Sequence, residues 1–169
     1  KIEDNLKYLS FKIATSIKDK KNNKVPVSTT LDDKFSNYFG SLEYTFNKYL
    51  NFDYQFSVDN NLKSFQYNLI NTTLSVNNFV TKFKFIEEND VIGSTNSIEN
   101  ETFYNLPGSN ILRFKTRKNR KINLTEYYDL VYEYKNDCLI AGVKYRKSYY
   151  EDREIKPTED LLFTITLTP

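Results

Sequence analysis

Apolar and polar residues alternate along most of the chain, and a period of two is typical of a β-strand whose two faces differ. On both sides of Asn47-Lys48, apolar residues occupy the even positions of 42–46 and 50–58, while polar residues fill most of the odd positions. The same alternation marks 161–167, where the odd positions are apolar. The pattern predicts a hairpin centred on Asn47-Lys48 and a last strand near the C-terminus.

About ten such segments can be counted. They lie near 6–17, 38–46, 49–58, 62–75, 78–88, 98–105, 110–118, 123–135, 138–150 and 159–168. Many contain ten residues or more, and ten residues tilted by about 40° rise ~25 Å, the height of the apolar band of an outer-membrane barrel. Strands of soluble sandwiches are usually shorter, with about five or six residues.

The predicted connections alternate between short and long. Four turns are short, at Asn47-Lys48, 76–78, 106–109 and 135–137, and three connections are longer, at 18–37, 89–97 and 151–158, with 59–61 as a tight exception. Membrane barrels have short turns on one side and longer loops on the other. We therefore predict an all-β, antiparallel, up-and-down transmembrane β-barrel, with residues 1–169 as a single segment. The alternative is a soluble antiparallel β-rich binding module, whose strands alternate as well.

Composition excludes several kinds of chemistry. The 169 residues include no His, so neither a Ser-His-Asp relay nor a His-ligated zinc site can form. We predict a protein that is not an enzyme and has no cofactor and no metal. The net charge of +2 gives the whole chain no attraction to nucleic acid. The chain contains no Met and begins at Lys1 without an apolar run, and we expect it to be a piece of a longer protein.

Two motifs in the last third carry a resemblance. The segment 134–139 reads Tyr-Lys-Asn-Asp-Cys-Leu, and 150–157 reads Tyr-Glu-Asp-Arg-Glu-Ile-Lys-Pro. Together with Tyr127 to Tyr134 and Leu162 to Ile165, they resemble the C-terminal end of the LptD family of outer-membrane lipopolysaccharide-assembly proteins. The resemblance covers about 45 residues, and outside them it is only that of a strand-rich barrel segment.

The resemblance implies a place and a function. The chain would form about ten C-terminal strands of a larger barrel in the cell outer membrane. That barrel inserts lipopolysaccharide (LPS) into the outer leaflet through its lumen and a lateral seam, without covalent catalysis. Its partners would be LPS, a plug lipoprotein similar to LptE, outer-membrane lipid, and the periplasmic LPS bridge, which an upstream domain would contact.

The resemblance also implies roles for particular residues. Cys138 would form a disulfide with the upstream periplasmic region, whereas an isolated cysteine is otherwise a small buried apolar residue. The last strand would line the lateral seam and pair with the first strand of the complete barrel. Its seam residues are Leu161, Phe163, Thr164, Ile165, Thr166 and Leu167.

Basic residues gather between 113 and 121. With Leu112 and Phe114 on the apolar face, three of the six would face the lumen and three would lie in the outer loop. Lys144 and Arg146 would join the first three. The candidate contacts to LPS phosphates are Arg113, Lys115, Arg117, Lys118, Arg120, Lys121, Lys144 and Arg146. Two interpretations compete with this one: a nucleic-acid patch, and a structural ladder of alternating charge that includes Asp129 and Glu133 on the next strand.

Overall fold

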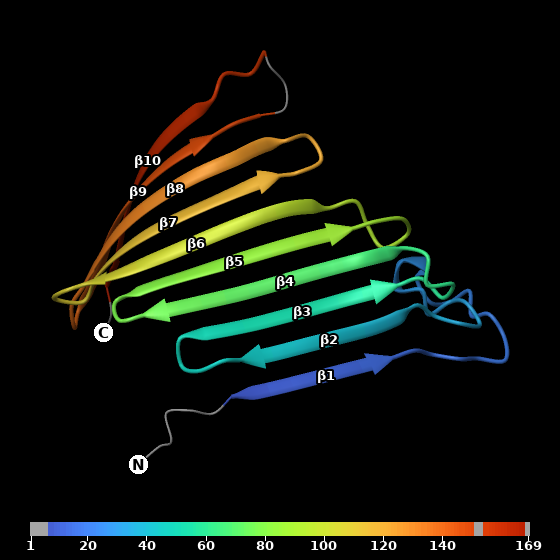
Figure 1. Cartoon of the computed structure of the whole chain (residues 1–169). Coiled ribbons are helices and arrows are strands. Elements are labelled where there is room, and N and C mark those ends of the chain that lie inside the picture. The colour runs from blue at the N-terminus through green and yellow to red at the C-terminus, as the bar shows by residue number, and fades with distance from the viewer. Residues whose placement is uncertain (1–6, 151–153, 168–169) are drawn as a thin grey trace. The chain divides into compact units, whose positions relative to one another are not determined.

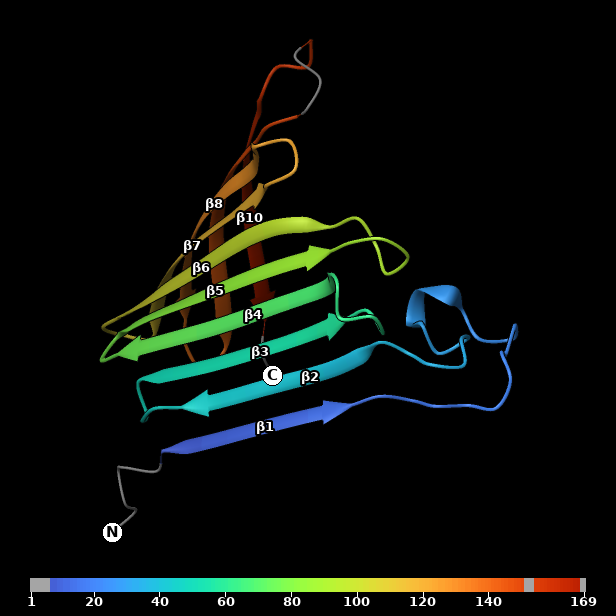
Figure 2. The ribbon, with the colours of Figure 1, turned by 45° about the vertical axis from the view of Figure 1, so that its right-hand side comes forward.

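The computed structural model describes residues 7–150 and 154–167. Within these residues the chain forms ten strands in one sheet, in the order β1 to β10, with each strand running opposite to the next (Figure 1). The strands are β1 Tyr8–Ala14, β2 Tyr38–Thr45, β3 Leu50–Val58, β4 Phe65–Val76, β5 Phe79–Glu88, β6 Asn96–Leu106, β7 Asn110–Asn119, β8 Leu124–Lys135, β9 Leu139–Ser148 and β10 Thr158–Leu167. A single turn of 3₁₀ helix, η1 Val27–Thr29, interrupts the connection between β1 and β2 (Figure 2).

The predicted all-β, antiparallel, up-and-down order is confirmed. The sheet is open, because no backbone pairing joins β1 to β10 in the described part of the chain, so the barrel stays a prediction. No helix in the described ranges is long and apolar enough to cross a membrane. Four stretches used in the sequence argument lie outside the described residues: position 6, Glu151 to Arg153, position 168 and Lys1.

The first strand is shorter than the predicted 6–17. It ends at Ala14, and beyond it Ile17 forms only an isolated bridge with Phe35. The ladder ends there because a side chain takes over part of the pairing: the Ser36 hydroxyl accepts the Ser16 N–H at 2.8 Å. Ser36 is 1% exposed, so this irregular crossing is closely packed.

The chain divides into two compact units, which we describe separately. The N-terminal unit contains the described part of 1–72 together with 84–96, and the C-terminal unit contains 73–83 and the described part of 97–169. Whether residues 1–169 act as a single domain stays a prediction.

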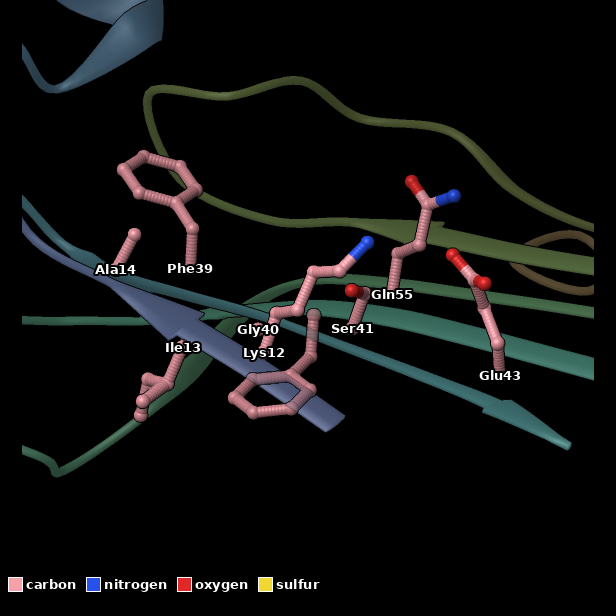
Figure 3. A pocket seen from close by; sticks show the side chains of 9 residues that line it. Lys12, Ile13, Ala14, Phe39, Gly40, Ser41, Glu43 and Gln55 are labelled. Carbon is pink, nitrogen blue, oxygen red and sulfur yellow. The ribbon is translucent and has the colours of Figure 1, made fainter. Parts of the chain in front are cut away.

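In the N-terminal unit the strand register separates an apolar face from a polar face. Phe11 lies opposite Leu42, which lies opposite Tyr54, and the neighbouring row is Lys12, Ser41 and Gln55. Figure 3 shows Lys12, Ser41 and Gln55 pointing to one side of the sheet and Ile13 to the other. The predicted hairpin is present, since β2 and β3 are joined by a short turn at 46–49.

Gly40 makes this register possible at one point of the apolar face. It lies between Ile13 of β1 and Phe56 of β3, and the Phe56 ring covers it. A Cβ atom at this position would overlap the ring. A residue without a side chain therefore lets the aromatic ring lie flat on the sheet.

The C-terminal unit shows the same separation over more strands. One row consists of Phe114, Leu130, Tyr145 and Leu161, and the adjacent row consists of Lys115, Asp129, Arg146 and Asp160. The register shifts once, between Arg117 and Lys118, where Glu126 of β8 has no partner on β7. We call the face with Asp129 the charged face and the opposite one the apolar face.

The described residues of neither unit form a hydrophobic core. Among the described residues no hydrophobic side chain is buried, and the buried residues are all polar or charged. They are Thr30, Ser36, Asn37, Ser57, Thr81, Ser97 and Asp129. The exposure is greatest in β10, where Phe163 is 71% and Leu167 78% exposed. The apolar faces of both units therefore have no cover within the described chain.

Candidate functional site: the charged face of the C-terminal unit

Asp129 is the centre of the charged face. It lies on β8 directly opposite Arg146 of β9, and the side chain of Arg146 donates from Nε to Oδ1 at 2.6 Å and from a terminal nitrogen to Oδ2 at 2.7 Å. Lys144, two residues along β9, places its Nζ 3.2 Å from Oδ2. Asp129 is only 5% exposed, and the two cations compensate its burial.

A second group of charges lies farther along the same face. The Arg117 guanidinium is 3.0 Å from the Glu126 carboxylate and 3.6 Å from that of Glu99 on β6. The Lys115 ammonium is 3.9 Å from Glu99, at the limit of an ion pair. The register shift between Arg117 and Lys118 accounts for the position of Glu126, because a bulge adds one residue and turns its side chain.

Arg113 has a different environment. Its guanidinium lies 5.0 Å from the centre of the Phe103 ring, and the Lys82 ammonium lies 5.1 Å from the same ring. Neither cation has a carboxylate partner within the described part of the chain, and the Arg113 Nε is enclosed without a hydrogen-bond acceptor. Two cations beside one aromatic ring are held there by cation–π attraction.

The structure brings together five of the eight predicted phosphate-contact residues. Arg113, Lys115, Arg117, Lys144 and Arg146 share the charged face, whereas Lys118 lies opposite Ile98 on the other face. Arg120 and Lys121 lie in the turn between β7 and β8. Four of the five contact carboxylates, so the predicted ladder of alternating charge is present. Arg113 is the one of the five that takes no part in these described ion pairs.

Cys138 is exposed and has no disulfide partner among the described residues. It lies in the short turn between β8 and β9, where the Asn136 side-chain oxygen accepts the N–H groups of Cys138 at 3.0 Å and Leu139 at 2.7 Å. The alternative interpretation, a small buried apolar residue, is wrong because the side chain is exposed. The disulfide to an upstream region stays a prediction.

The last strand pairs on one side only. Thr164 lies opposite Gly142 and Thr166 opposite Ile140 of β9, and the other edge of β10 meets no strand in the described chain. Thr164 and Thr166 share the charged face, since they alternate with Phe163 and Ile165. That this edge forms the lateral seam of a barrel stays a prediction.

Sequence reasoning missed two hydrogen-bonded groups on the apolar faces. In the C-terminal unit, the Thr81 hydroxyl lies 2.9 Å from that of Thr102 and accepts the Asn100 amide at 3.0 Å. In the N-terminal unit, the Tyr54 hydroxyl donates to Asn68 at 2.8 Å, and Asn68 donates to Glu87 at 3.2 Å. Glu87 is the second-last residue of β5, close to the 89–95 connection, which places its charge at the border of the apolar face. The even positions of Asn100 and Thr102, shared with Ile98 and Tyr104, are a signal that could have revealed the first group.

No protein-family model and no curated protein matches this chain.

Proposed function

We propose that this chain is a membrane-spanning part of an outer-membrane translocon that inserts LPS into the outer leaflet. It would belong to an LptD-like barrel and act by binding and lateral release rather than by covalent chemistry. LPS, a plug lipoprotein and the periplasmic LPS bridge would be its partners, and the surrounding lipid would cover its apolar face.

The uncovered apolar faces carry the membrane part of this proposal. Leu130 is 46% and Tyr132 43% exposed, and both alternate with charged-face residues along β8. Exposing apolar surface to water costs about 25 cal/mol per Å². Monomeric soluble proteins rarely leave large apolar patches uncovered. Lipid would remove that cost over the whole face.

The charged face, on the other side of the sheet, supports the proposal that the barrel interior is filled with water. Its charges are paired across neighbouring strands, as in the contact of Arg146 with Asp129, and a polar lumen is typical of outer-membrane barrels. Up-and-down strands also leave few backbone groups unpaired in the membrane, because each interior strand bonds to two neighbours.

The LPS part of the proposal depends on the sequence resemblance in 124–169. The charged face adds one feature: Arg113 has no carboxylate partner among the described residues and could contact a phosphate, for which a guanidinium is well suited. Its neighbours on the ladder are occupied by carboxylates, so we place the substrate contact at Arg113 and Lys82 rather than along all eight basic residues.

Spin-label accessibility tests the membrane part. In a Cys138→Ser background, single labels at Leu130→Cys and Val131→Cys sample the two faces of the same strand. In liposomes we expect the label at position 130 to be relaxed mainly by oxygen and the label at 131 mainly by a water-soluble nickel complex. Equal access of the nickel complex to both labels would instead favour the soluble binding module.

Photo-cross-linking tests the LPS part. A photoreactive amino acid at position 113 should capture LPS during transport in cells, and the same amino acid at Leu112, on the opposite face, should not. Capture at 112 alone, or at neither position, would contradict transport along the charged face.

A further inference from the structure

We propose that a cavity on the polar face of the N-terminal unit binds a zwitterionic amino acid with an apolar side chain. The cavity has a volume of 370 Å³ and is lined by residues of β1, β2 and β3, all in the N-terminal unit. Its volume lies within the range of about 300–1,000 Å³ that is usual for small-molecule sites. The proposal is independent of LPS transport.

The side chains that line the cavity from the polar face form three successive rows across the strands. They are Ala14 and Phe39 in the first row, Lys12, Ser41 and Gln55 in the second, and Glu43 in the third. Figure 3 shows the longer of these side chains on one side of the sheet. One end of the cavity is therefore apolar, and the rest carries a cation, an anion and neutral polar groups.

Lys12 and Glu43 are charges of opposite sign that line the same cavity without contacting each other. Glu43 lies opposite Ser10, two residues from Lys12 on the same face. Long side chains at such diagonal positions can meet. No ion pair joins these two, and neither pairs with another described side chain. A ligand that carries both charges could pair with both.

Glu43 has a particular need of a cation. It lies directly opposite Asp53 of β3, and like charges in opposite positions destabilise a sheet. Asp53 accepts the side-chain amides of Gln55 at 3.2 Å and Asn71 at 3.1 Å, whereas Glu43 accepts no hydrogen bond from a described residue. A ligand ammonium beside Glu43 would offset this repulsion. The Gln55 Oε1, which accepts no hydrogen bond from a described residue, would be its second acceptor.

The neighbouring donors suit a carboxylate. The Lys12 ammonium and the Ser41 hydroxyl lie in the same row, and neither donates a hydrogen bond to a described residue. Hydrogen bonds from a cation to a carboxylate are stronger than those between neutral groups. Beyond this row, Phe39 and Ala14 supply an apolar surface, against which an alkyl side chain on the same ligand would pack.

The mixed charge of the wall determines the ligand class. A simple amine would leave the Lys12 ammonium without a partner, and a simple carboxylate would leave Glu43 without one. Within the described ranges no three acidic side chains are placed to hold a metal ion. A ligand with an ammonium, a carboxylate and an alkyl group on one carbon atom matches all three parts of the cavity.

Calorimetric titration of the detergent-solubilised protein with L-leucine tests the proposal. Two probes keep the alkyl chain but lack one charge each: 3-methylbutylamine has no carboxylate, and 4-methylpentanoate has no ammonium. We expect saturable binding of L-leucine, and binding of each probe weaker by about tenfold or more, equivalent to about 1.4 kcal/mol. Lys12→Gln and Glu43→Gln should each weaken the binding of L-leucine to a similar extent.

Two matched variants serve as controls. Lys20→Gln and Asp19→Asn change exposed charges in the connection between β1 and β2 that do not line the cavity, and they should leave the affinity unchanged. Absence of L-leucine binding at millimolar concentration, equal binding of either singly charged probe, or equal weakening by the control variants would overturn the proposal.

The thermal unfolding midpoint is the second measurement. L-leucine should raise it for the unmodified protein and not for Glu43→Gln. Without ligand, Glu43→Gln should keep or raise the midpoint, because the change removes the repulsion from Asp53. A lower midpoint for this variant without ligand would contradict an uncompensated Glu43 and overturn its role as the ammonium partner.

Discussion

At the scale of single residues, the ion pairs of the charged face differ in burial and geometry, and these differences determine what each contributes. Asp129 is buried and receives two hydrogen bonds from one guanidinium, while Glu99 meets its cations at 3.6 and 3.9 Å. Removing one member of a buried pair leaves the partner's charge uncompensated, whereas loose exposed pairs contribute little.

Asp129→Asn should therefore lower the free energy of unfolding by about 1–3 kcal/mol, less than for a fully buried pair because Arg146 and Lys144 are partly exposed. Glu99→Gln, the matched change on the same face, should cost no more than about 0.5 kcal/mol. Denaturant unfolding in detergent measures both. Equal losses would mean that burial of Asp129 contributes nothing.

Cys138 gives a second prediction at this scale. The turn between β8 and β9 exposes its thiol, so a cysteine from elsewhere in a longer protein could reach it. In the full-length protein we expect Cys138 to be oxidised, and Cys138→Ser should abolish the difference in mobility between reduced and unreduced gels. Alkylation of Cys138 in mature outer membranes without prior reduction would contradict this.

At the scale of the strand, β3 allows the two faces to be compared within four residues. Phe52 lies opposite Tyr44 on the apolar face, and Gln55 lies opposite Ser41 on the polar face. If lipid covers the apolar face, Phe52→Arg should lower the free energy of unfolding by ~2–4 kcal/mol near the midplane, and Gln55→Arg should have little effect. Folding titrations in lipid vesicles measure the difference. Similar costs for the two variants would show that lipid does not cover the Phe52 side.

The edge of β10 gives a prediction about movement. One side of the strand meets no other strand of the described chain, and a seam that opens must be weaker than neighbouring strand pairs. A disulfide between Thr166→Cys and a cysteine on the first strand of the complete barrel should block LPS delivery without preventing assembly. Reduction should restore delivery. Normal LPS transport by the cross-linked protein would contradict a seam at β10.

At the scale of the whole molecule, the absence of buried hydrophobic side chains from the described residues has a measurable consequence. Purified in buffer without detergent, the chain should associate through its apolar faces and the open edge of β10, and detergent should disperse it. Light scattering with and without detergent measures this. A monomer that unfolds cooperatively in plain buffer would instead support the soluble module.

Local sequence was sufficient to predict the strands and most of their faces. Side chains alternate strictly along a strand, so Phe52 and Gln55 had to point in opposite directions whatever their partners. Short turns such as 135–137 bring consecutive strands together, so Arg146 is expected near Asp129 from the sequence alone, and the two residues lie opposite each other.

Tertiary structure alone decided which side chains meet where a shift in strand register or a long connection separates them in the sequence. The bulge beside Arg117 turned Glu126 toward it, and pairing across strands joined Thr81 to Thr102. The packing of the connection after β1 buried Asn37 against Ser57 and Gln66 and enclosed Asp32. Alternation is a property of one strand, but such contacts depend on the relative positions of distant segments, which no local pattern encodes.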